Sequence, residues 1–302
     1  MNKKSTFEVV IIGGSYAGLS AAMALGRSLR HVLVIDSNDP CNKRTPNSHN
    51  FLTHDGETPL AIAQKAKKKL LAYSTIAFLE DLAIDGRFLD NCFEIETLSG
   101  QTVTAKKLIF ASGITDIMHD IKGFSACWGI SAIHCPYCHG YEFRNQKTGI
   151  MANGERAFHL AGLVNNLTDD LTIFSQGKAD FSPEERQKLK RNRVKVNESP
   201  IIEFEHSNGH LEQLHFENGQ SEPFKAIYAS LPIRQKSDIP IALGCEADEM
   251  GLLKVDSFQK TNIPGIFACG DNSSRMRSIA YSVATGNVAG AMVNMELVHE
   301  KF

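Results

Sequence analysis

The residues with the clearest capacity for chemistry are two cysteines, Cys135 and Cys138, separated by Pro136 and Tyr137. Two sulfurs at this spacing can close a small disulfide ring and reopen it by thiol–disulfide exchange. His139 follows the second sulfur directly, where an imidazole can give and take the proton that each opening and closing requires. We therefore expect Cys135, Cys138 and His139 to be catalytic, and we expect a second group that holds electron pairs to lie near them.

Metal binding and a structural disulfide are the alternatives for this pair. A zinc ribbon also contains Cys-x-x-Cys, but it needs a second pair, and the other cysteines are singletons: Cys41, Cys92, Cys127, Cys245 and Cys269. His134 and His139 flank the pair more tightly than structural zinc spacings allow. No secretory signal is recognisable and seven cysteines cannot all pair, so a redox pair is favoured and no metal site is predicted.

The composition favours a two-domain protein that acts on small molecules or proteins. The chain has 302 residues, 42% of them hydrophobic, and a net charge of -2. Because no basic run is interleaved with aromatic residues, a nucleic-acid surface is not expected. Residues 1–4 are basic, but the apolar run after them is too short for a signal peptide or a membrane span. We expect no membrane partner and a cytoplasmic location.

The start of the chain predicts a βαβ nucleotide-binding unit. It contains a buried strand at 7–12, the turn Gly-Gly-Ser-Tyr-Ala-Gly at 13–18, a helix at 19–29, a second buried strand at 31–35, and Asp36. Glycine permits the tight turn, the helix N-terminus offers N–H groups to a pyrophosphate, and the acid can hold a ribose hydroxyl. Ser15 stands where the motif has its middle glycine. A flavin bound here would hold the electron pairs.

The βαβ plan occurs a second time, with a strand at 148–152, a helix at 153–163 and a strand at 171–174. Polar crossings at 114–121 and 240–244 separate this region from the rest, and a strand at 265–268 and an Ala- and Gly-rich helix at 277–297 return to the first unit. We therefore predict an α/β fold of two Rossmann-like domains, the second inserted in the first. Residues 1–116 and 243–302 would form the FAD-binding domain, and residues 117–242 an NAD(P)-binding-like domain that carries the redox centre. Two linkers at one point can act as a swivel.

Between the two units, the long loop at 40–56 is a candidate to wrap a cofactor. We expect a helix at 58–73, a meander of short strands near 76–82, 92–98 and 102–105, and another buried strand at 107–111.

Three motifs in order carry a resemblance to a known family. The turn at 13–18, Cys-Pro-Tyr-Cys-His-Gly-Tyr-Glu at 135–142 and Gly-Ile-Phe-Ala-Cys-Gly-Asp at 265–271 have the order and spacing of the low-molecular-weight thioredoxin reductases. The resemblance covers essentially the whole chain. Because His139 rather than an aspartate follows the second cysteine, the chain most resembles the branch that includes dithiol oxidases acting on gliotoxin-like and holomycin-like metabolites.

The resemblance implies a cofactor, a set of site residues and a homodimer. FAD would be bound by Gly13, Ser15, Tyr16, Ala17, Asp36, Gly113, Gly270 and Asp271, with Asn50 near the ring and Arg277, Ser278 and Ile279 directing N–H groups at its O2 edge. Cys138 would be the sulfur nearest the flavin, Cys135 the sulfur that exchanges with substrate, and His139 the acid/base group.

The match is weakest at the second nucleotide turn. The family pattern is Gly-x-Gly-x-x-Ala or Gly, whereas residues 152–157 read Ala-Asn-Gly-Glu-Arg-Ala. Members that use NADPH also place arginines after the second strand, where this chain offers Lys178 and the acid Asp180. We therefore expect weak recognition of NADPH.

The sequence supports an FAD-dependent thiol–disulfide oxidoreductase and leaves its direction and substrate open. In a reductase, NADPH or a ferredoxin-like protein would reduce FAD, and Cys135 would attack a disulfide in a thioredoxin-like protein or a small molecule. In an oxidase, a small-molecule dithiol would reduce the cysteines, and oxygen would reoxidise FAD. A non-catalytic flavin redox sensor is the hypothesis from another class, and the cysteine pair argues against it.

Overall fold

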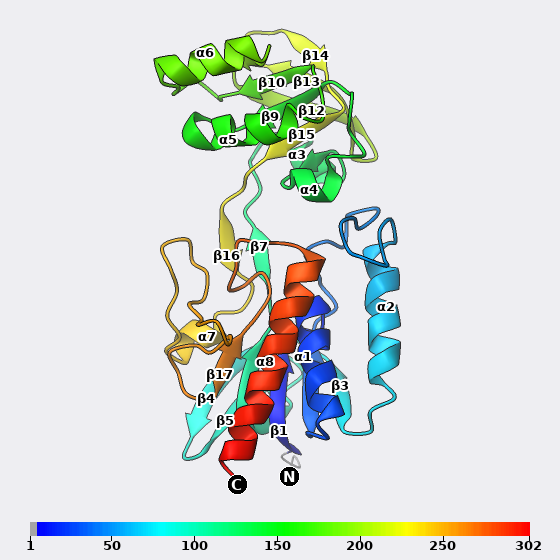
Figure 1. Ribbon diagram of the computed structural model, residues 1–302, viewed down its shortest axis with the longest axis vertical. Helices are drawn as coiled ribbons and strands as arrows, with labels where there is room; N and C mark the ends of the chain where they lie inside the picture. The colour runs from blue at the N-terminus through cyan, green and yellow to red at the C-terminus, as the bar shows by residue number, and fades with distance from the viewer. Residues whose placement is uncertain (1–4) are drawn as a thin grey trace.

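The computed structural model describes residues 5–302 and consists of two sheet-based parts stacked along the long axis of the molecule (Figure 1). The basic start at residues 1–4 lies outside the described residues. The lower part in Figure 1 is built on a seven-stranded sheet of order β3-β2-β1-β6-β5-β4, in which β17 also pairs with β6. The strands are β1 (Ser5–Ile12), β2 (Val32–Asp36), β3 (Ile76–Glu80), β4 (Ala83–Leu89), β5 (Cys92–Thr97), β6 (Thr102–Phe110) and β17 (Ile266–Ala268).

Helices cover this sheet because its central parallel strands are apolar on both faces. On one face, α1 (Tyr16–Arg27) and α8 (Ile279–His299) lie side by side, with α2 (Pro59–Leu70) beside α1 (Figure 1). Glycines allow the close approach of α1 and α8, since a Cβ added to Gly286 would lie 2.1 Å from the Ala17 carbonyl oxygen. The other face packs against residues of the short helix α7 (Ile239–Ala242) and of the segment around Leu253.

The upper part contains a second parallel sheet, of order β11-β10-β9-β15-β8. Its strands are β8 (Ala132–Ile133), β9 (Thr148–Met151), β10 (Leu171–Phe174), β11 (Lys195–Asn197) and β15 (Ala226–Ala229). A three-stranded antiparallel sheet is added by β12 (Ile201–Ser207), β13 (His210–Phe216) and β14 (Ser221–Pro223), and the helices are α3 (Phe124–Cys127), α4 (Pro136–His139), α5 (Gly154–Val164) and α6 (Pro183–Arg191). Phe124, Phe174, Phe204, Phe216 and Phe224 form an aromatic core in this part.

Two antiparallel segments join the parts. The chain leaves the first sheet through β7 (Ile114–Asp116) and returns through β16 (Ile233–Gln235), which pairs with β7 (Figure 1). The predicted fold class, two Rossmann-like units with the second inserted in the first, is confirmed. The domain boundaries after residues 116 and 242 stay a prediction. The predicted division assigns β7 to the first domain and β16 to the second, although the two strands pair with each other.

Several predicted elements differ from the observed ones. The strands expected at 102–105 and 107–111 are one strand, β6, because Lys106 interrupts the apolar pattern without interrupting the ladder. β4 was not predicted, since its polar sequence Ala-Ile-Asp-Gly-Arg-Phe-Leu pairs at the sheet edge, where one face is exposed. The last helix begins at Ile279 rather than Arg277, because the Ser278 hydroxyl accepts the N–H of Tyr281 (3.2 Å) and caps it. Within residues 5–302, each helix is too short or too polar to cross a membrane.

Candidate active site

A cavity of about 940 Å³ lies where the first sheet faces the redox segment. It brings together most of the residues that the sequence singled out: Gly13, Ser15, Tyr16, Ala17, Asp36, Gly113, Gly270, Asp271, Arg277, Ser278, Ile279, Cys138 and His139. These residues come from the β1–α1 turn, the end of β2, the segments after β6 and β17, the start of α8, and α4. Ligands of parallel sheets bind at this carboxyl edge of the strands, so the position is that of a nucleotide site.

The floor of the cavity is the β1–α1 turn, and its backbone conformation requires glycine. Gly13 has φ +106°, and a Cβ there would lie 2.3 Å from the Ala111 carbonyl oxygen. A Cβ on Gly14 would lie 2.7 Å from the Cβ of Asp36. Ser15 occupies the N-cap position of α1 but makes no side-chain capping bond, so its hydroxyl and the first N–H groups of α1 are left for a ligand.

Three buried polar atoms on the cavity wall have no hydrogen-bond partner within the described residues. They are Ser112 Oγ, His134 Nε2 and Arg277 Nε. Burial lowers the pKa of His134 to about 3, so this imidazole is neutral. Buried polar groups normally have partners, and three orphans on one wall indicate that a polar ligand completes them.

The redox pair stands at the beginning of the short helix α4. Cys135 is the N-cap residue and Cys138 lies in the helix, and both thiols are free. The Cys138 thiol donates to the Cys135 sulfur, which lowers the pKa of Cys135 to about 7, and the backbone N–H groups of Cys138 and Tyr137 act in the same direction. The same shared proton, together with burial, raises the pKa of Cys138. The pair therefore holds one proton between its sulfurs, with the negative charge on Cys135.

The two sulfurs differ in what they face. Cys138 lines the cavity, whereas Cys135 is absent from the lining and is half-buried. Tyr137 and Tyr141, on the same segment, are 69% and 67% exposed. One sulfur thus belongs to the cavity wall and the other does not.

His139 is half-buried beside Cys138 and lines the same cavity. Burial lowers the pKa of His139, and the nearby His49 lowers it further, whereas Glu142 raises it. The His49 ring lies 6.4 Å from the His139 ring, centroid to centroid, at 90°. In the sequence His49 had no signal of its own beyond its place in a loop of suitable length.

Arg277 connects the cavity to the linker. Its guanidinium donates two hydrogen bonds to Asp116 of β7 (2.8 and 3.0 Å), and the Trp128 indole N–H donates to the same carboxylate (3.2 Å). Arg277 Nε also lies 3.8 Å from Asp271, whose pKa is raised by burial. The guanidinium therefore joins the start of α8, the linker and the upper part, a role that the sequence did not indicate.

The loop at 40–56 forms one side of the cavity, as expected from its length. Cys41, Asn42, Lys43, Arg44, Thr45, Pro46, Ser48 and His49 line it. The loop also contacts the upper part, because Arg44 donates to the Ser125 carbonyl oxygen (2.5 Å). Asn50 does not line the cavity: it is exposed, with φ +59°, and its N–H donates to Asp55 Oδ1 (2.7 Å). The turn at Asn50 directs its neighbour His49 toward the cavity instead.

The second nucleotide turn is closed by its own side chains. Asn153 Oδ1 accepts the N–H of Gly154 (2.8 Å) and the N–H of Asp180 (2.9 Å), and Asn153 Nδ2 donates to the Lys178 carbonyl oxygen (2.9 Å). The Ser175 hydroxyl donates to the Gly177 carbonyl oxygen (2.6 Å). The first N–H group of α5, which a dinucleotide phosphate would use, is thus already bonded within the turn.

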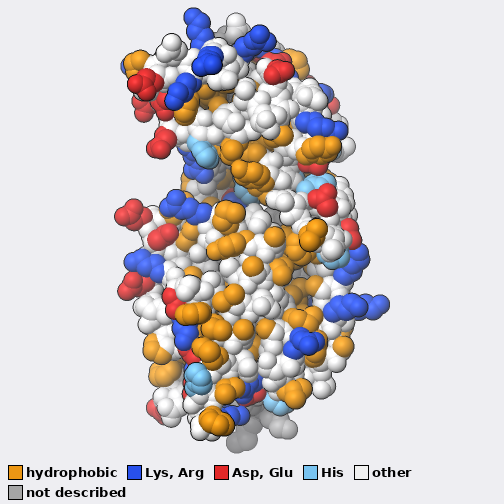
Figure 2. Space-filling view, in the orientation of Figure 1, with side chains coloured by type: hydrophobic (Ala, Val, Ile, Leu, Met, Phe, Trp, Pro, Cys, Tyr) orange, Lys and Arg blue, Asp and Glu red, His pale blue; other side chains and the backbone are white. Residues whose placement is uncertain are grey.

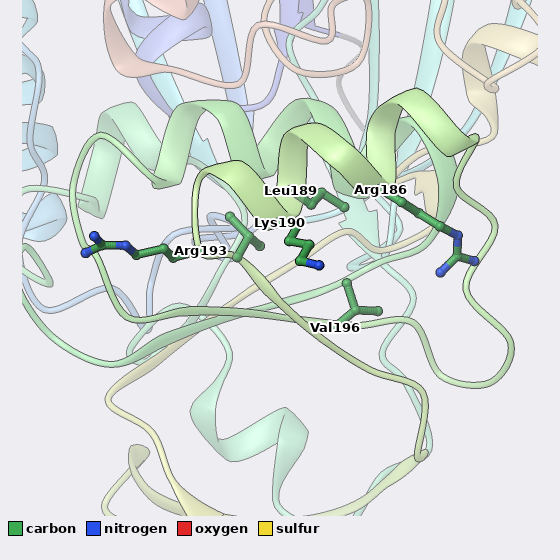
Figure 3. A pocket seen from close by; sticks show the side chains of 6 residues that line it. Arg186, Leu189, Lys190, Arg193 and Val196 are labelled. Atoms are coloured by element: carbon green, nitrogen blue, oxygen red, sulfur yellow. The ribbon is translucent and has the colours of Figure 1, made fainter.

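A shallower pocket of about 320 Å³ lies on α6 and β11 (Figure 3). Leu189, Val194 and Val196 line it together with the cationic side chains of Arg186, Lys190 and Arg193. Arg186 donates to the carbonyl oxygens of Ala179 and Phe181, and no thiol is part of this pocket. Clusters of three or more potential metal ligands are also absent from residues 5–302. The chemistry of the molecule is therefore concentrated at the cavity below α4.

Comparisons with known proteins agree with this site. A family model described as pyridine nucleotide-disulphide oxidoreductase matches residues 7–286. The chain is 30% identical to the thioredoxin reductase tcpT of Claviceps purpurea, over 99% of this chain and 96% of that protein. It resembles the solved structure of an oxidoreductase from Agrobacterium tumefaciens (33% identity, TM-score 0.92, 98% and 100% of the two chains). It also resembles TrxB of Bacillus anthracis, described as a thioredoxin reductase (25% identity, TM-score 0.93, 98% and 100%).

The resemblance predicted from the three ordered motifs, including its placement near the fungal branch, is confirmed. The chain belongs to the pyridine nucleotide-disulphide oxidoreductase family, and it is a thioredoxin-reductase-like, FAD-dependent thiol–disulfide oxidoreductase.

Proposed function

We propose that Cys135 and Cys138 form the redox-active disulfide of this enzyme and pass electron pairs between FAD in the cavity and a thiol or disulfide substrate. The observation that carries the proposal is the division of the pair, with Cys138 on the cavity wall and Cys135 half-buried outside it. Electrons can therefore enter at one sulfur and leave at the other without either sulfur changing its neighbours.

FAD is the cofactor that the family implies, and the residues present fit it. The turn at Gly13 has no room for a side chain, Gly113 (φ +70°) faces open space, and Ser112 Oγ is buried without a partner. We propose that FAD is held by Gly13, Ser15, Tyr16, Ala17, Asp36, Gly113, Gly270, Asp271, Arg277, Ser278 and Ile279, the lining residues named above. FAD would supply two-electron chemistry there, taking up two electrons and one proton from the thiols or returning them.

The residues of the redox segment supply the exchange chemistry. With its pKa near 7, Cys135 is partly thiolate at neutral pH and can attack a substrate disulfide, or its sulfur in the oxidised pair can be attacked by a substrate thiolate. Cys138 then resolves the mixed disulfide by closing or opening the bond to Cys135. We propose that His139 holds the proton that the leaving thiolate needs.

The second turn does not fit NADPH, although that donor is typical of thioredoxin reductases. Asn153 already bonds the N–H groups of Gly154 and Asp180, and Glu155 and Asp180 place carboxylates where a 2′-phosphate would bring more negative charge. This observation favours a second candidate, the oxidase direction, in which a small-molecule dithiol reduces the cysteines and oxygen accepts two electrons and two protons as hydrogen peroxide. A ferredoxin-like donor is the remaining route to reductase activity.

A small-molecule dithiol or disulfide is the substrate that the site supports best, with a thioredoxin-like protein as the alternative. Cys135 is half-buried in the arrangement in which Cys138 already lines the cavity, so a small substrate can reach it directly. We also propose the domain division at residues 116/117 and 242/243, a cytoplasmic location, and no nucleic-acid or membrane partner.

We further propose that the protein is a homodimer. Tyr281, Met295 and Val298 are exposed on α8, which has no charged residue before Glu296. Figure 2 shows hydrophobic side chains gathered over this face of the lower part. Exposed apolar side chains gathered on one helix are often covered by a partner, and a second copy of the chain is the partner the family suggests.

The test is an anaerobic titration of the FAD-loaded enzyme with dithiothreitol, NADPH and NADH in parallel. We expect dithiothreitol to bleach the visible flavin band and both nicotinamides to act slowly. Cys138→Ser should lose bleaching by dithiothreitol, whereas Cys92→Ser, a matched change on β5 outside the cavity, should retain it. Full bleaching of Cys138→Ser at the wild-type rate would refute the proposed electron path.

A further inference from the structure

The loop before α2 brings a second histidine to the redox centre. His49 lines the cavity with His139, and the two imidazole rings are perpendicular at 6.4 Å. The residues belong to different parts of the molecule, since His49 precedes α2 and His139 ends α4. In Figure 1 this loop rises from α2 toward α4.

His49 is also placed between two carboxylates. Its Nε2 lies 3.5 Å from Glu142 Oε1, and its Nδ1 lies 3.6 Å from Asp55 Oδ2. The His49 side chain is 20% exposed, whereas the side chains of Glu142 and Asp55 are 37% and 68% exposed. The four side chains therefore form a series from the half-buried His139 through His49 to the carboxylates of Glu142 and Asp55 in contact with solvent.

Other titratable groups also surround the two histidines. His134 is buried and neutral, Cys138 shares its proton with Cys135, and burial raises the pKa of Tyr228, a phenol that also faces Cys135 and Glu142. Positive charge on both His49 and His139 would be repulsive, and the two carboxylates can balance one or both. The two imidazoles therefore interact electrostatically across the boundary between the two parts.

The proposed redox chemistry needs an exit for a proton. Oxidising a substrate dithiol through the Cys135–Cys138 pair removes two electrons and two protons from the substrate, and only one of these protons accompanies the electrons to the cofactor. The second proton must leave the half-buried site through groups of the chain, and it must return when the bond is opened again. His139 alone has no carboxylate within ion-pair distance among the described residues, whereas His49 has two.

We propose that His49 is a positioning and proton-relay residue, which passes the second proton between His139 and the carboxylates of Glu142 and Asp55. The relay rests on the proposed role of His139 and extends it across the two parts of the molecule. Because His49 comes from the lower part and both His139 and Glu142 come from the upper part, the path is complete only while α4 is docked over the cavity. Proton release is thereby coupled to the arrangement in which Cys138 faces the cofactor.

The experiment uses the FAD-loaded enzyme and three variants: His49→Gln, Glu142→Gln and the control His54→Gln. His54 lies in the same loop, pairs with Glu57 (3.0 Å) and does not line the cavity. The first readout is the NMR titration of the His139 ring, assigned with His139→Gln. We expect His49→Gln to raise the pKa of His139, because a repelling neighbour is lost, and Glu142→Gln to lower it, because an attracting carboxylate is lost. His54→Gln should leave it unchanged.

The second readout is the single-turnover rate of flavin reduction by dithiothreitol as a function of pH. We expect His49→Gln to slow this rate by about tenfold, less than the 10²- to 10⁴-fold typical of a direct acid/base group. A slower rate with an unchanged His139 titration would mean a structural role and would overturn the relay, as would an unchanged rate. If both His49→Gln and His139→Gln leave the pH profile of the reduction rate unchanged, the proposed function of His139 fails. If His49→Gln leaves the profile unchanged and His139→Gln alters it, only the relay fails.

Discussion

The chain contains two strand–turn–helix units of the same plan, and their surroundings differ. The first turn, at residues 13–18, packs closely against the backbone at Ala111. The first N–H groups of α1 and the Ser15 hydroxyl face a large cavity. In the second turn, at residues 152–157, the Asn153 side chain accepts hydrogen bonds from the N–H group of Gly154 and from that of Asp180 in a neighbouring loop. A nucleotide-type turn is therefore a binding site only when its donors are left unpaired.

The comparison also shows how such a unit can change its use. The second unit keeps its sheet, its helix and a buried core, so it still positions α4 over the cavity. Three hydrogen bonds of one asparagine side chain occupy the N–H groups of Gly154 and Asp180 and the Lys178 carbonyl oxygen while the fold stays intact. The unit then acts as a carrier of the redox pair.

The largest expected effect comes from filling the first turn. Gly13→Val should weaken FAD binding to the apoprotein by at least about 100-fold, close to 2.7 kcal/mol, because the new side chain meets the Ala111 carbonyl. The measurement is fluorescence titration of apoprotein with FAD. Gly154→Ala is the matched change in the second turn, where a Cβ has room; it should cost about 1 kcal/mol of folding free energy for its positive φ and leave FAD affinity unchanged. Equal losses of FAD affinity in both variants would remove the distinction between the turns.

The next effect concerns the electron donor. NADPH should bleach the flavin at least about tenfold more slowly than typical enzyme turnover, because the N–H groups of Gly154 and Asp180 in the second turn are already bonded to Asn153. Anaerobic stopped-flow absorbance measures this rate, with dithiothreitol as the positive control. Rapid, stoichiometric bleaching by NADPH would show that the second turn opens on binding.

A smaller effect should follow from opening the second turn by mutation. Asn153→Gly frees the N–H groups of Gly154 and Asp180, and we expect it to increase the rate of flavin reduction by NADPH by about threefold, close to 0.7 kcal/mol. Asn153→Asp is the control, since its carboxylate can still accept both N–H groups and adds negative charge. An equal gain in both variants would argue that the Asn153 side chain does not block the site.

The last prediction is a pH dependence at the redox pair, which distinguishes its two sulfurs. Because the pKa of Cys135 is lowered to about 7, its thiolate fraction falls as the pH drops through this value. The alkylation rate of the reduced enzyme by iodoacetamide should decrease about tenfold for each pH unit below that point and level off above it. Cys138→Ala removes the donated hydrogen bond, so the break in the profile should move to higher pH. A profile that is the same in both proteins would mean that Cys138 does not set the reactivity of Cys135.

Sequence reasoning predicted the units whose signals are local. The glycine turn, the strand before it, Asp36 at the end of β2, and the Cys-x-x-Cys-His segment were all identified because each depends on neighbours in the chain. The same reasoning missed β4 at the sheet edge. It also placed Asn50 at the cofactor, where the structure has His49, because the backbone turn at Asn50 decides which of the two adjacent side chains lines the cavity.

The pairs that cross between the two parts were beyond the sequence. His49 meets His139 across 90 residues, and Arg277 meets Asp116 across 161 residues. Neither pair has a pattern in the chain, because both depend on how the linker strands β7 and β16 set one part over the other.

The order of residues by itself determined the chemistry available to this protein: two sulfurs that can form a disulfide, a turn that can bind a nucleotide, and a second turn that departs from the pattern. The tertiary structure alone decided which histidines meet and that the Asn153 side chain bonds the second turn. The physical reason is the separation along the chain between the residues that interact. Turn conformation and thiol spacing are set by bonds between near neighbours, whereas these contacts arise from the packing of distant segments, in which many weak interactions are satisfied together.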